Sequence, residues 1–344
     1  MLTQNEVLAQ SRAALEQWHP RWQSHARENG AILKRKGRPQ DELLMCGIGR
    51  SVVCCGLGPS LTENIAEMRL HRDCWDVGAV DKAFAFLVER GVKPEFVCVA
   101  DAMVSYEKYC EPYLKDTEGV ALLMNVCANP KWAENWKGPV YFFVNKDNLK
   151  TEVEFSQLSG CTQAIPAASN VGDALVAFLM QVVSYDRYLL VGFDYCWKPD
   201  GDYYAGQWED RKRSFMWHQV QPTEKGFVHT SSNLKFSARW MSQYIASLMA
   251  MGVAPEVRDC SDGILDAPKS TLEREAALIL ARGVKRPWTK AEKEEFVTAK
   301  RKSLTLAMQD FGKIPELLAD KTMLTLNVTL NGIPRAVADM VGAG

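Results

Sequence analysis

The sequence from Ser51 to Leu61 reads SVVCCGLGPSL, an apolar run followed by two closely spaced glycines and then Pro-Ser. The run Val52–Cys55 is too short for a buried helix and is typical of a strand that is covered on both faces. Pro59 suits the first turn of a helix, because its missing N–H leaves no donor unsatisfied there. The stretch therefore predicts a strand, a tight turn and the start of a helix.

Short apolar runs of the same kind recur along the chain, at Val77–Val80, Phe96–Ala100, Ala121–Met124, Val140–Val144 and Tyr188–Phe193. Segments with helical spacing lie between them, at Leu61–Leu70, Lys82–Arg90, Tyr106–Leu114 and Gly172–Ser184. An alternation of strands and helices is the pattern of βαβ units. The sequence therefore predicts an α/β fold built on a doubly wound, mostly parallel sheet.

The two ends of the chain lack this alternation of strand and helix patterns. Residues 1–44 carry apolar residues at helical spacing and are predicted to form a helical N-terminal extension. Residues 45–268 hold the α/β pattern, and residues 269–344 are predicted to be mainly helical, with an alternating terminal strand at Leu324–Leu330. We expect any homo-oligomer to form through these terminal regions.

Composition narrows the classes of function. The 41 Lys and Arg residues nearly balance 42 Asp and Glu, so nucleic acid is not implied as a partner. No window resembles a signal peptide or a membrane span, and we expect a cytoplasmic protein with no membrane partner. The ten cysteines lack pairing rhythm and contain no C-x-x-C motif, which favours reduced thiols over disulfides or zinc.

The glycine turn is the first candidate site. Two glycines let backbone amides approach an anion, and the N–H groups and dipole of the following helix favour phosphate. Gly56, Gly58, Pro59 and Ser60 are therefore predicted to bind a nucleotide, with the Ser60 hydroxyl as an extra donor. The alternative is a purely structural βα turn. Leu61 replaces the third glycine of the dinucleotide fingerprint, which argues against an oxidoreductase.

Further polar residues follow predicted strands or precede predicted helices. Asp81 ends the second strand, where it can accept hydrogen bonds from ribose hydroxyls or cap the next helix. Ser169, Asn170 and Gly172 begin a later helix and offer either an ordinary cap or a site for base, ribose or a second phosphate. All four are predicted nucleotide-binding residues.

Four residues are candidates for catalysis. Asp101 and Asp194 end two predicted strands, and they can hold Mg²⁺ on a diphosphate, act as a general base, or order loops. His218 and His229 lie in or beside the long aromatic segment Tyr195–Ser232, where they are either general bases or exposed loop residues without a role. Asp101 and Asp194 are the metal candidates only if the reaction needs Mg²⁺.

Several segments, taken in order, resemble one family: Gly56–Leu61, Ala79–Ala83, Val92–Val97, Ser169–Gly172 and Val191–Asp194. The family contains the archaeal 6-hydroxymethylpterin diphosphokinases, or MptE-like proteins, and the motility accessory factor (Maf) glycosyltransferases of flagellin. The glycine turn also resembles that of bacterial sialyltransferases, which use CMP-sugars. The resemblance implies that residues 45–268 form a Rossmann-like nucleotide-binding transferase domain. It also implies that six residues lie near the nucleotide: Gly58, Ser60, Asp81, Asp101, Asn170 and Asp194.

The resemblance leaves more than one activity open, because a shared fold does not fix the chemistry. We favour glycosyl transfer from a nucleotide sugar to an acceptor hydroxyl, because the aromatic segment after Asp194 suits a sugar or a large acceptor. The alternative is a diphosphokinase that uses ATP with Mg²⁺ and acts on 6-hydroxymethylpterin or a similar small molecule. A third reading is a nucleotide-binding or structural protein without turnover. The sequence names no acceptor.

Overall fold

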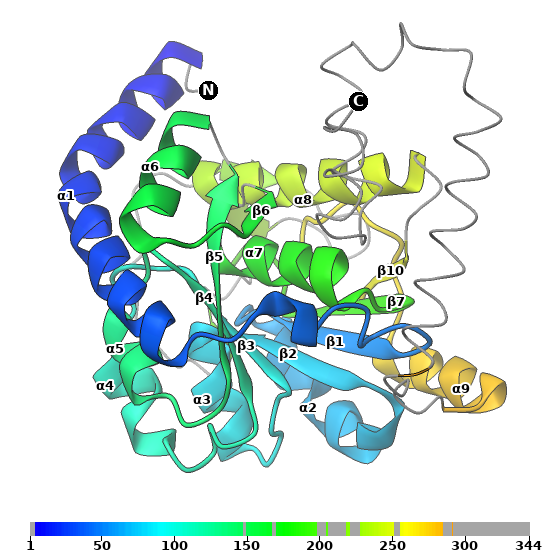
Figure 1. The fold of residues 1–344 in the computed structure, drawn as a ribbon. Coiled ribbons are helices and arrows are strands. Elements are labelled where there is room, and N and C mark those ends of the chain that lie inside the picture. The colour runs from blue at the N-terminus through cyan, green and yellow to red at the C-terminus, as the bar shows by residue number, and fades with distance from the viewer. Residues whose placement is uncertain are drawn as a thin grey trace, which may run out of the picture.

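A parallel sheet forms the centre of the computed structural model, which describes residues 4–146, 149–166, 170–197, 204–205, 218–220, 228–250, 255–284 and 291 (Figure 1). Its strands run in the order β10-β7-β1-β2-β3-β4-β5-β6, and every neighbouring pair is parallel. The strands are β1 (Ser51–Cys55), β2 (Asp76–Val80), β3 (Phe96–Val99), β4 (Ala121–Asn125), β5 (Val140–Lys146), β6 (Ala164–Pro166), β7 (Arg187–Val191) and β10 (Glu256–Asp259).

The sheet is doubly wound, as the sequence predicts. The chain moves outward from β1 to β6, crosses back to place β7 on the other side of β1, and adds β10 beyond it. The direction of winding therefore reverses between β1 and β7. In open sheets of this kind, ligands bind outside the carboxyl ends of the strands at this reversal point.

Helices cover both faces of the sheet (Figure 1). Helix α7 packs across β1, β2 and β3 on one face, and α3 packs against β2 and β3 on the other. The helices are α1 (Gln4–Lys36), α2 (Ser60–Leu70), α3 (Asp81–Glu89), α4 (Tyr106–Tyr109), α5 (Pro130–Asn135), α6 (Leu149–Ser159), α7 (Val171–Phe178), α8 (Ser232–Ala250) and α9 (Leu272–Arg282).

The N-terminal helix is packed onto the domain rather than projecting from it. Helix α1 lies along α6 and α5 (Figure 1). The buried Asn29 amide donates from α1 to the carbonyl oxygens of Val126 and Ala128 at 2.8 and 2.9 Å. Because buried amide groups need partners, these bonds fix α1 against the loop after β4.

Some local predictions are wrong. The helix predicted over Tyr106–Leu114 is split into α4 and a 3₁₀ turn at Glu111–Tyr113, because Pro112 has no N–H with which to continue an α-helix. The short edge strand β6 and the helices α5 and α6 were not predicted. The predicted terminal strand at Leu324–Leu330 lies outside the described residues.

Two expectations about the whole chain can be compared with the structure. All ten cysteines lie in the described residues, and none forms a disulfide. Among the described helices, none combines the length and the apolar character that crossing a membrane requires.

Candidate functional site

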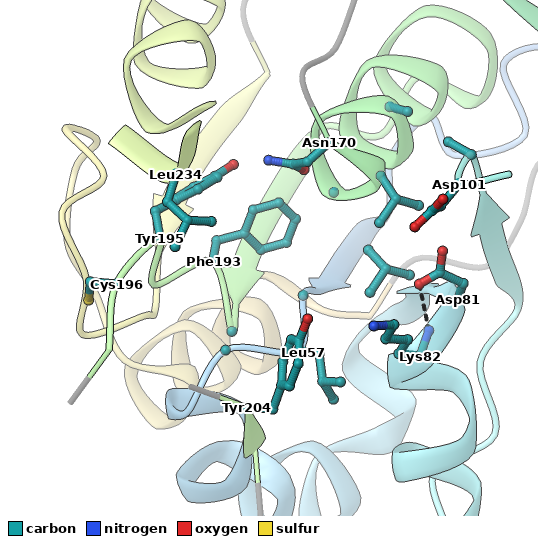
Figure 2. A pocket seen from close by; sticks show the side chains of 18 of the residues that line it. Leu57, Asp81, Lys82, Asp101, Asn170, Phe193, Tyr195, Cys196, Tyr204 and Leu234 are labelled. Carbon is teal, nitrogen blue, oxygen red and sulfur yellow. Dashed lines mark hydrogen bonds between the residues drawn. The ribbon is translucent and has the colours of Figure 1, made fainter. Parts of the chain in front are cut away.

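A cavity of about 600 Å³ opens at the carboxyl ends of the strands, beside the reversal point between β1 and β7 (Figure 2). Its volume is in the range of ordinary small-molecule sites. Residues from the ends of β1, β2, β3, β5 and β7, from the start of α7 and from α1 line it. The predicted site residues among them are Gly56, Gly58, Asp81, Asp101, Asn170 and Gly172.

The glycine turn is shaped by contact between two strand ends. The N–H of Gly56 donates to the carbonyl of Val191 at 2.8 Å, and that of Gly58 donates to the carbonyl of Gly192 at 2.9 Å. A Cβ on Gly56 would lie 2.3 Å from the carbonyl oxygen of Gly192, which no side chain tolerates. The glycine amides are therefore bonded to the loop after β7, and the glycines let the two loops approach each other.

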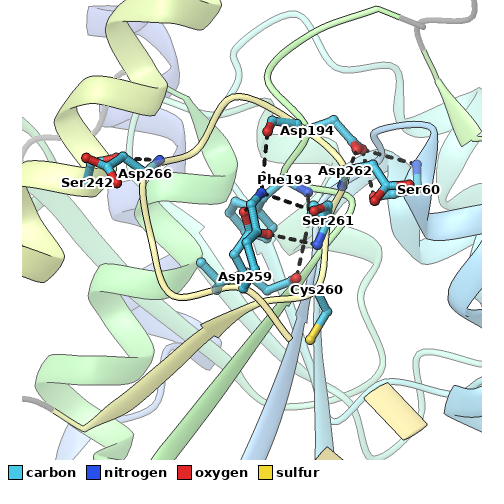
Figure 3. Close-up of polar contacts among 12 residues, drawn as sticks. Ser60, Phe193, Asp194, Ser242, Asp259, Cys260, Ser261, Asp262 and Asp266 are labelled. Carbon is cyan, nitrogen blue, oxygen red and sulfur yellow. Dashed lines mark hydrogen bonds and ion pairs between the residues drawn. The ribbon is translucent and has the colours of Figure 1, made fainter. Parts of the chain in front are cut away.

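The start of α2 binds a carboxylate from the same chain (Figure 3). The backbone N–H and the hydroxyl of Ser60 donate to Oδ2 of Asp194 at 3.2 and 2.9 Å. The N–H of Gly192 donates to the Ser60 hydroxyl oxygen at 3.2 Å. The Ser60 hydroxyl thus donates one hydrogen bond and accepts another, both within the protein. The prediction that this hydroxyl donates to a bound phosphate needs correction, because its side chain points to the buried carboxylate.

Of the roles predicted for Asp194, the structure agrees with the ordering of loops. Its Oδ1 accepts the N–H of Asp262 at 3.2 Å, and the residue is only 3% exposed. Burial raises the pKa of Asp194 to about 6, and the hydrogen bonds from Ser60 and Asp262 offset part of this rise. Asp194 does not line the cavity, and its carboxylate instead stabilises the conformation of the glycine turn.

The start of α7 faces the cavity. Oδ1 of Asn170 accepts the N–H of Asp173 at 3.0 Å, so this residue is an N-cap, and both Asn170 and Gly172 line the cavity. A Cβ on Gly172 would lie 2.9 Å from the Phe193 ring, so a glycine lets this turn pack closely on the loop after β7. The first amides of a helix have no acceptor within it, and here they border the cavity. Ser169 lies outside the described residues.

Two carboxylates and a lysine lie at the ends of β2 and β3. Asp81 is buried and Asp101 is exposed, yet both line the cavity, and Figure 2 shows them facing each other. Oδ1 of Asp101 accepts the N–H of Met103 at 2.7 Å. The Lys82 ammonium lies 5.5 and 5.2 Å from the ring centroids of Tyr109 and Tyr204.

The two residues predicted to hold a metal ion, Asp101 and Asp194, do not both line the cavity. The carboxylates that share the cavity are Asp81 and Asp101 (Figure 2), whereas the Asp194 carboxylate is bonded to Ser60 (Figure 3). Within the described part of the chain, no group of three or more His, Cys, Asp or Glu side chains could hold a metal ion. Mg²⁺ commonly takes one or two carboxylates together with substrate phosphates, and Asp81 with Asp101 fits that donor set.

The predicted histidine bases lie in a small hairpin. Strands β8 (His218–Val220) and β9 (Val228–Thr230) pair antiparallel, and Gln219 is opposite His229. The carbonyl of His229 accepts the N–H of Trp197 at 2.7 Å. His229 is not among the described residues that line the cavity, and the side chain of His218 lies outside the described part of the chain, so the catalytic role of both stays a prediction.

Several residues that line the cavity were not among the predicted site residues, for example Trp22, Asn145 and Tyr195. Asn145 directly follows the predicted strand Val140–Val144, and this position at a strand end is the signal that identified Asp81. Trp22 had no such signal, since only the packing of α1 brings it to the cavity.

Comparisons with known proteins agree with the fold. Residues 31–200 match the family model described as 6-hydroxymethylpterin diphosphokinase MptE-like. The solved structure of the MAf glycosyltransferase from Magnetospirillum magneticum AMB-1 is similar, with a TM-score of 0.54 at 15% sequence identity. The similar region covers 77% of this chain and 41% of the glycosyltransferase, so the chain spans about two fifths of that protein's length. No curated protein matches the sequence.

The two positive comparisons have different scope. At 15% identity the structural similarity concerns the fold alone, and it agrees with the Rossmann-like architecture predicted from the sequence. The family match runs from the last turns of α1 past the end of β7, and so includes most of the strand ends that line the cavity. Over residues 31–200 the chain therefore matches the MptE-like family, which its ordered motifs resemble.

Proposed function

We propose that this protein is a nucleotide-dependent transferase, and that it moves a glycosyl group from a nucleotide sugar to an acceptor hydroxyl. The observation that carries the proposal is the cavity of about 600 Å³ at the reversal point of the sheet. Polar groups from several strand ends and the start of α7 converge there. A nucleotide sugar needs such a site, because its phosphate, ribose and sugar are recognised by different groups.

The phosphates of the donor lie at the start of α7. The first turn of a helix favours an anion through its N–H groups and the positive end of the helix dipole, and the Lys82 ammonium adds a positive charge to the same cavity. Asp81 accepts from the ribose hydroxyls. The glycine turn before α2 predicted a phosphate at the start of that helix. We place the phosphate at α7 instead, because the Asp194 carboxylate binds the start of α2.

The chemical step uses Asp101 as the general base. Its carboxylate takes the proton of the acceptor hydroxyl while the acceptor oxygen bonds to the anomeric carbon of the sugar. The bond between that carbon and the phosphate oxygen breaks, and its electron pair leaves with the nucleotide. Lys82 and the α7 amides stabilise the negative charge that develops on the departing phosphate.

A second candidate function is Mg²⁺-dependent diphosphate transfer from ATP, and the pair of carboxylates at Asp81 and Asp101 favours it. These two residues would hold Mg²⁺ together with the phosphates of ATP. The ion would supply positive charge to the transferred diphosphate. The family match to 6-hydroxymethylpterin diphosphokinase MptE-like supports this candidate too.

Thermal unfolding with a panel of ligands separates these functions. The panel contains UDP-glucose, GDP-mannose, CMP-N-acetylneuraminate, and ATP with 6-hydroxymethylpterin, each with Mg²⁺ or with EDTA. A ligand at about 100 times its Kd raises the free energy of unfolding by about 2.7 kcal/mol, which gives a measurable rise in Tm. We expect one nucleotide sugar to raise Tm in both conditions and to be turned over with release of its nucleotide.

Other results would point elsewhere. A rise with ATP that requires Mg²⁺, together with release of AMP, would support diphosphate transfer. Binding without release of nucleotide would support a non-catalytic nucleotide-binding protein. No rise in Tm with any ligand of the panel would contradict the proposed nucleotide site.

A further inference from the structure

One wall of the cavity comes from a part of the chain outside the family match. Trp22 lies on α1, before residue 31, and lines the cavity together with Asp101 and Asn145. Its side chain is half-buried, packed against the core on one side and open to the cavity on the other. The N-terminal helix thus adds an aromatic side chain to the cavity from outside the matched region.

The turn of α1 that carries Trp22 is held on several sides. The Arg21 guanidinium contacts the sulfur of Met103, two residues after Asp101. The Gln23 amide donates to Glu154 of α6 at 2.7 Å. Because the neighbours of Trp22 contact two different elements, the turn of α1 that carries the indole is held beside the cavity before any ligand binds.

A third contact joins the same turn to the residues around Asn145. His25 Nδ1 lies 3.2 Å from the carbonyl oxygen of Cys127, in the loop after β4. Asn125 precedes that loop, and its Oδ1 accepts the N–H of Cys127 at 2.8 Å. Its Nδ2 must then be the donor to Oδ1 of Asn145, at 2.9 Å. This network leaves the Nδ2 group of Asn145 to donate at the cavity wall.

Three kinds of group therefore meet on one side of the cavity. Trp22 offers a flat apolar face, Asn145 a hydrogen-bond donor, and Asp101 a carboxylate acceptor with one oxygen bonded to Met103. A sugar ring has the complementary surface, with an apolar face of C–H groups and an edge of hydroxyls that both donate and accept. The start of α7 and Lys82 are in the same cavity, which suits a sugar attached to a phosphate.

We propose that Trp22 and Asn145 form the subsite for the sugar ring of the donor, with the ring stacked on Trp22 and its anomeric carbon beside Asp101. This inference rests on the proposed function. It assigns to α1 a direct part in substrate recognition, and it predicts that the contribution of Trp22 to affinity depends on the sugar and not on the nucleotide.

The experiment is isothermal titration calorimetry on the full chain. UDP, GDP and CMP are compared with UDP-glucose, GDP-mannose and CMP-N-acetylneuraminate. Wild-type protein is expected to bind one nucleotide sugar more tightly than the matching nucleotide. Trp22→Ala should weaken that nucleotide sugar roughly tenfold and leave the matching nucleotide unchanged, because truncating a buried aromatic contact commonly costs this much.

Matched variants separate recognition from folding. Trp18 lies one turn earlier on α1, is half-buried and does not line the cavity, so Trp18→Ala should bind both ligands as the wild type does. Trp22→Phe keeps an aromatic face and should recover most of the lost affinity. Asn145→Ala should show the same selective loss as Trp22→Ala, and it decides the question if Trp22→Ala does not fold.

Two results would overturn the subsite while the proposed function stands. These are an equal loss for nucleotide and nucleotide sugar in both variants, or no loss in either. If wild-type protein binds none of the nucleotides or nucleotide sugars, the proposed function itself fails. A selective loss of 6-hydroxymethylpterin binding in Trp22→Ala, measured with ATP and Mg²⁺, would replace the sugar by a flat heterocycle and overturn the assignment.

Discussion

Helices α2 and α7 both begin at the carboxyl edge of the sheet, but their N-termini have different occupants. At α2, the Ser60 N–H and hydroxyl bind the carboxylate of Asp194 (Figure 3). At α7, Asn170 caps the helix through its own side chain, and the first turn borders the cavity (Figure 2). A glycine turn before a helix is thus compatible with an internal anion as well as with a ligand.

The N-termini of α2 and α7 differ because the first is covered by neighbouring loops and the second is accessible. Ser60 and Asp194 are 1% and 3% exposed, because the glycines of the turn let the loop after β7 close over the start of α2. A buried N–H that lacked an acceptor would cost about 1–3 kcal/mol, and the Asp194 carboxylate supplies that acceptor. Asn170 is half-buried and its helix start stays accessible, so an external ligand can reach it.

The largest expected effect on stability comes from adding a side chain beside the buried N-terminus of α2. A Cβ on Gly58 would lie 2.0 Å from Oδ2 of Asp194 and 2.7 Å from the carbonyl oxygen of Gly192. Because both atoms are buried and held by hydrogen bonds, we expect Gly58→Ala to lower the free energy of unfolding by about 3 kcal/mol. Urea denaturation measures this loss.

Gly172→Ala is the matched change at the open end. Its Cβ would lie 2.9 Å from the Phe193 ring and 3.1 Å from Oδ1 of Asn170, side-chain atoms that can shift. We expect a loss of about 1 kcal/mol in unfolding free energy, with weaker ligand binding as the main effect. Equal losses of stability in the two variants would contradict the distinction between an enclosed and an open helix start.

The second effect is a pH dependence of stability that comes from Asp194, at the start of α2. Burial raises the pKa of Asp194 from its ordinary 3.8 to about 6, so between these values the folded chain keeps a proton that the unfolded chain has lost. The free energy of unfolding therefore falls as the pH rises from 4 to 7. We expect the contribution of Asp194 to this fall to be roughly 2 kcal/mol.

Asp194→Asn isolates that contribution, because the amide does not titrate. Chemical denaturation of wild type and variant at pH 4, 5, 6 and 7 gives the difference in stability at each pH. The wild type should lose stability relative to the variant across this series, whatever the constant cost of replacing one oxygen by an NH₂ group. A pH-independent difference would show that the pKa of Asp194 is the same in the folded and unfolded chains, and the expected cost of burying its charged form would be refuted.

Most of the sheet could be predicted because its strands are short apolar runs buried on both faces, a pattern that local sequence displays directly. Strands β1, β2, β3, β4, β5 and β7 lie within one or two residues of their predicted ranges. Strand β6 (Ala164–Pro166) could not be found this way, since it is three residues long and ends in proline. Its place in the sheet depends on pairing with β5, which is a tertiary contact.

The part of the candidate site that could be predicted is the part that the sheet topology brings together. In βαβ units the strands end and the following helices begin at one edge of the sheet. Asp81 and Asp101 at strand ends and Asn170 at a helix start were therefore expected together, and all three line the cavity. The direction in which a side chain points was not predictable. Ser60 and Asp194 turn toward each other because glycines let their two loops touch, and nothing in either local sequence records that contact.

The smallest expected effect on stability comes from removing the cap of α7, and it tests whether that helix start is a binding site. Asn170→Ala removes the acceptor for the Asp173 N–H and should lower the free energy of unfolding by about 1 kcal/mol. Thr271 caps α9 in the same way, accepting the N–H of Arg274 at 3.2 Å, and it does not line the cavity. Thr271→Ala should therefore cost a similar amount of stability.

The two cap variants should differ in ligand binding. Removing Asn170 loosens the first turn of α7, so we expect the nucleotide that stabilises the wild type to bind Asn170→Ala roughly tenfold more weakly. Thr271→Ala should keep the wild-type affinity, because its helix start lies away from the cavity. Calorimetric titration of both variants measures this difference. If both bind the nucleotide as tightly as the wild type, the start of α7 does not hold the phosphate, and the contrast between the two helices concerns only their packing.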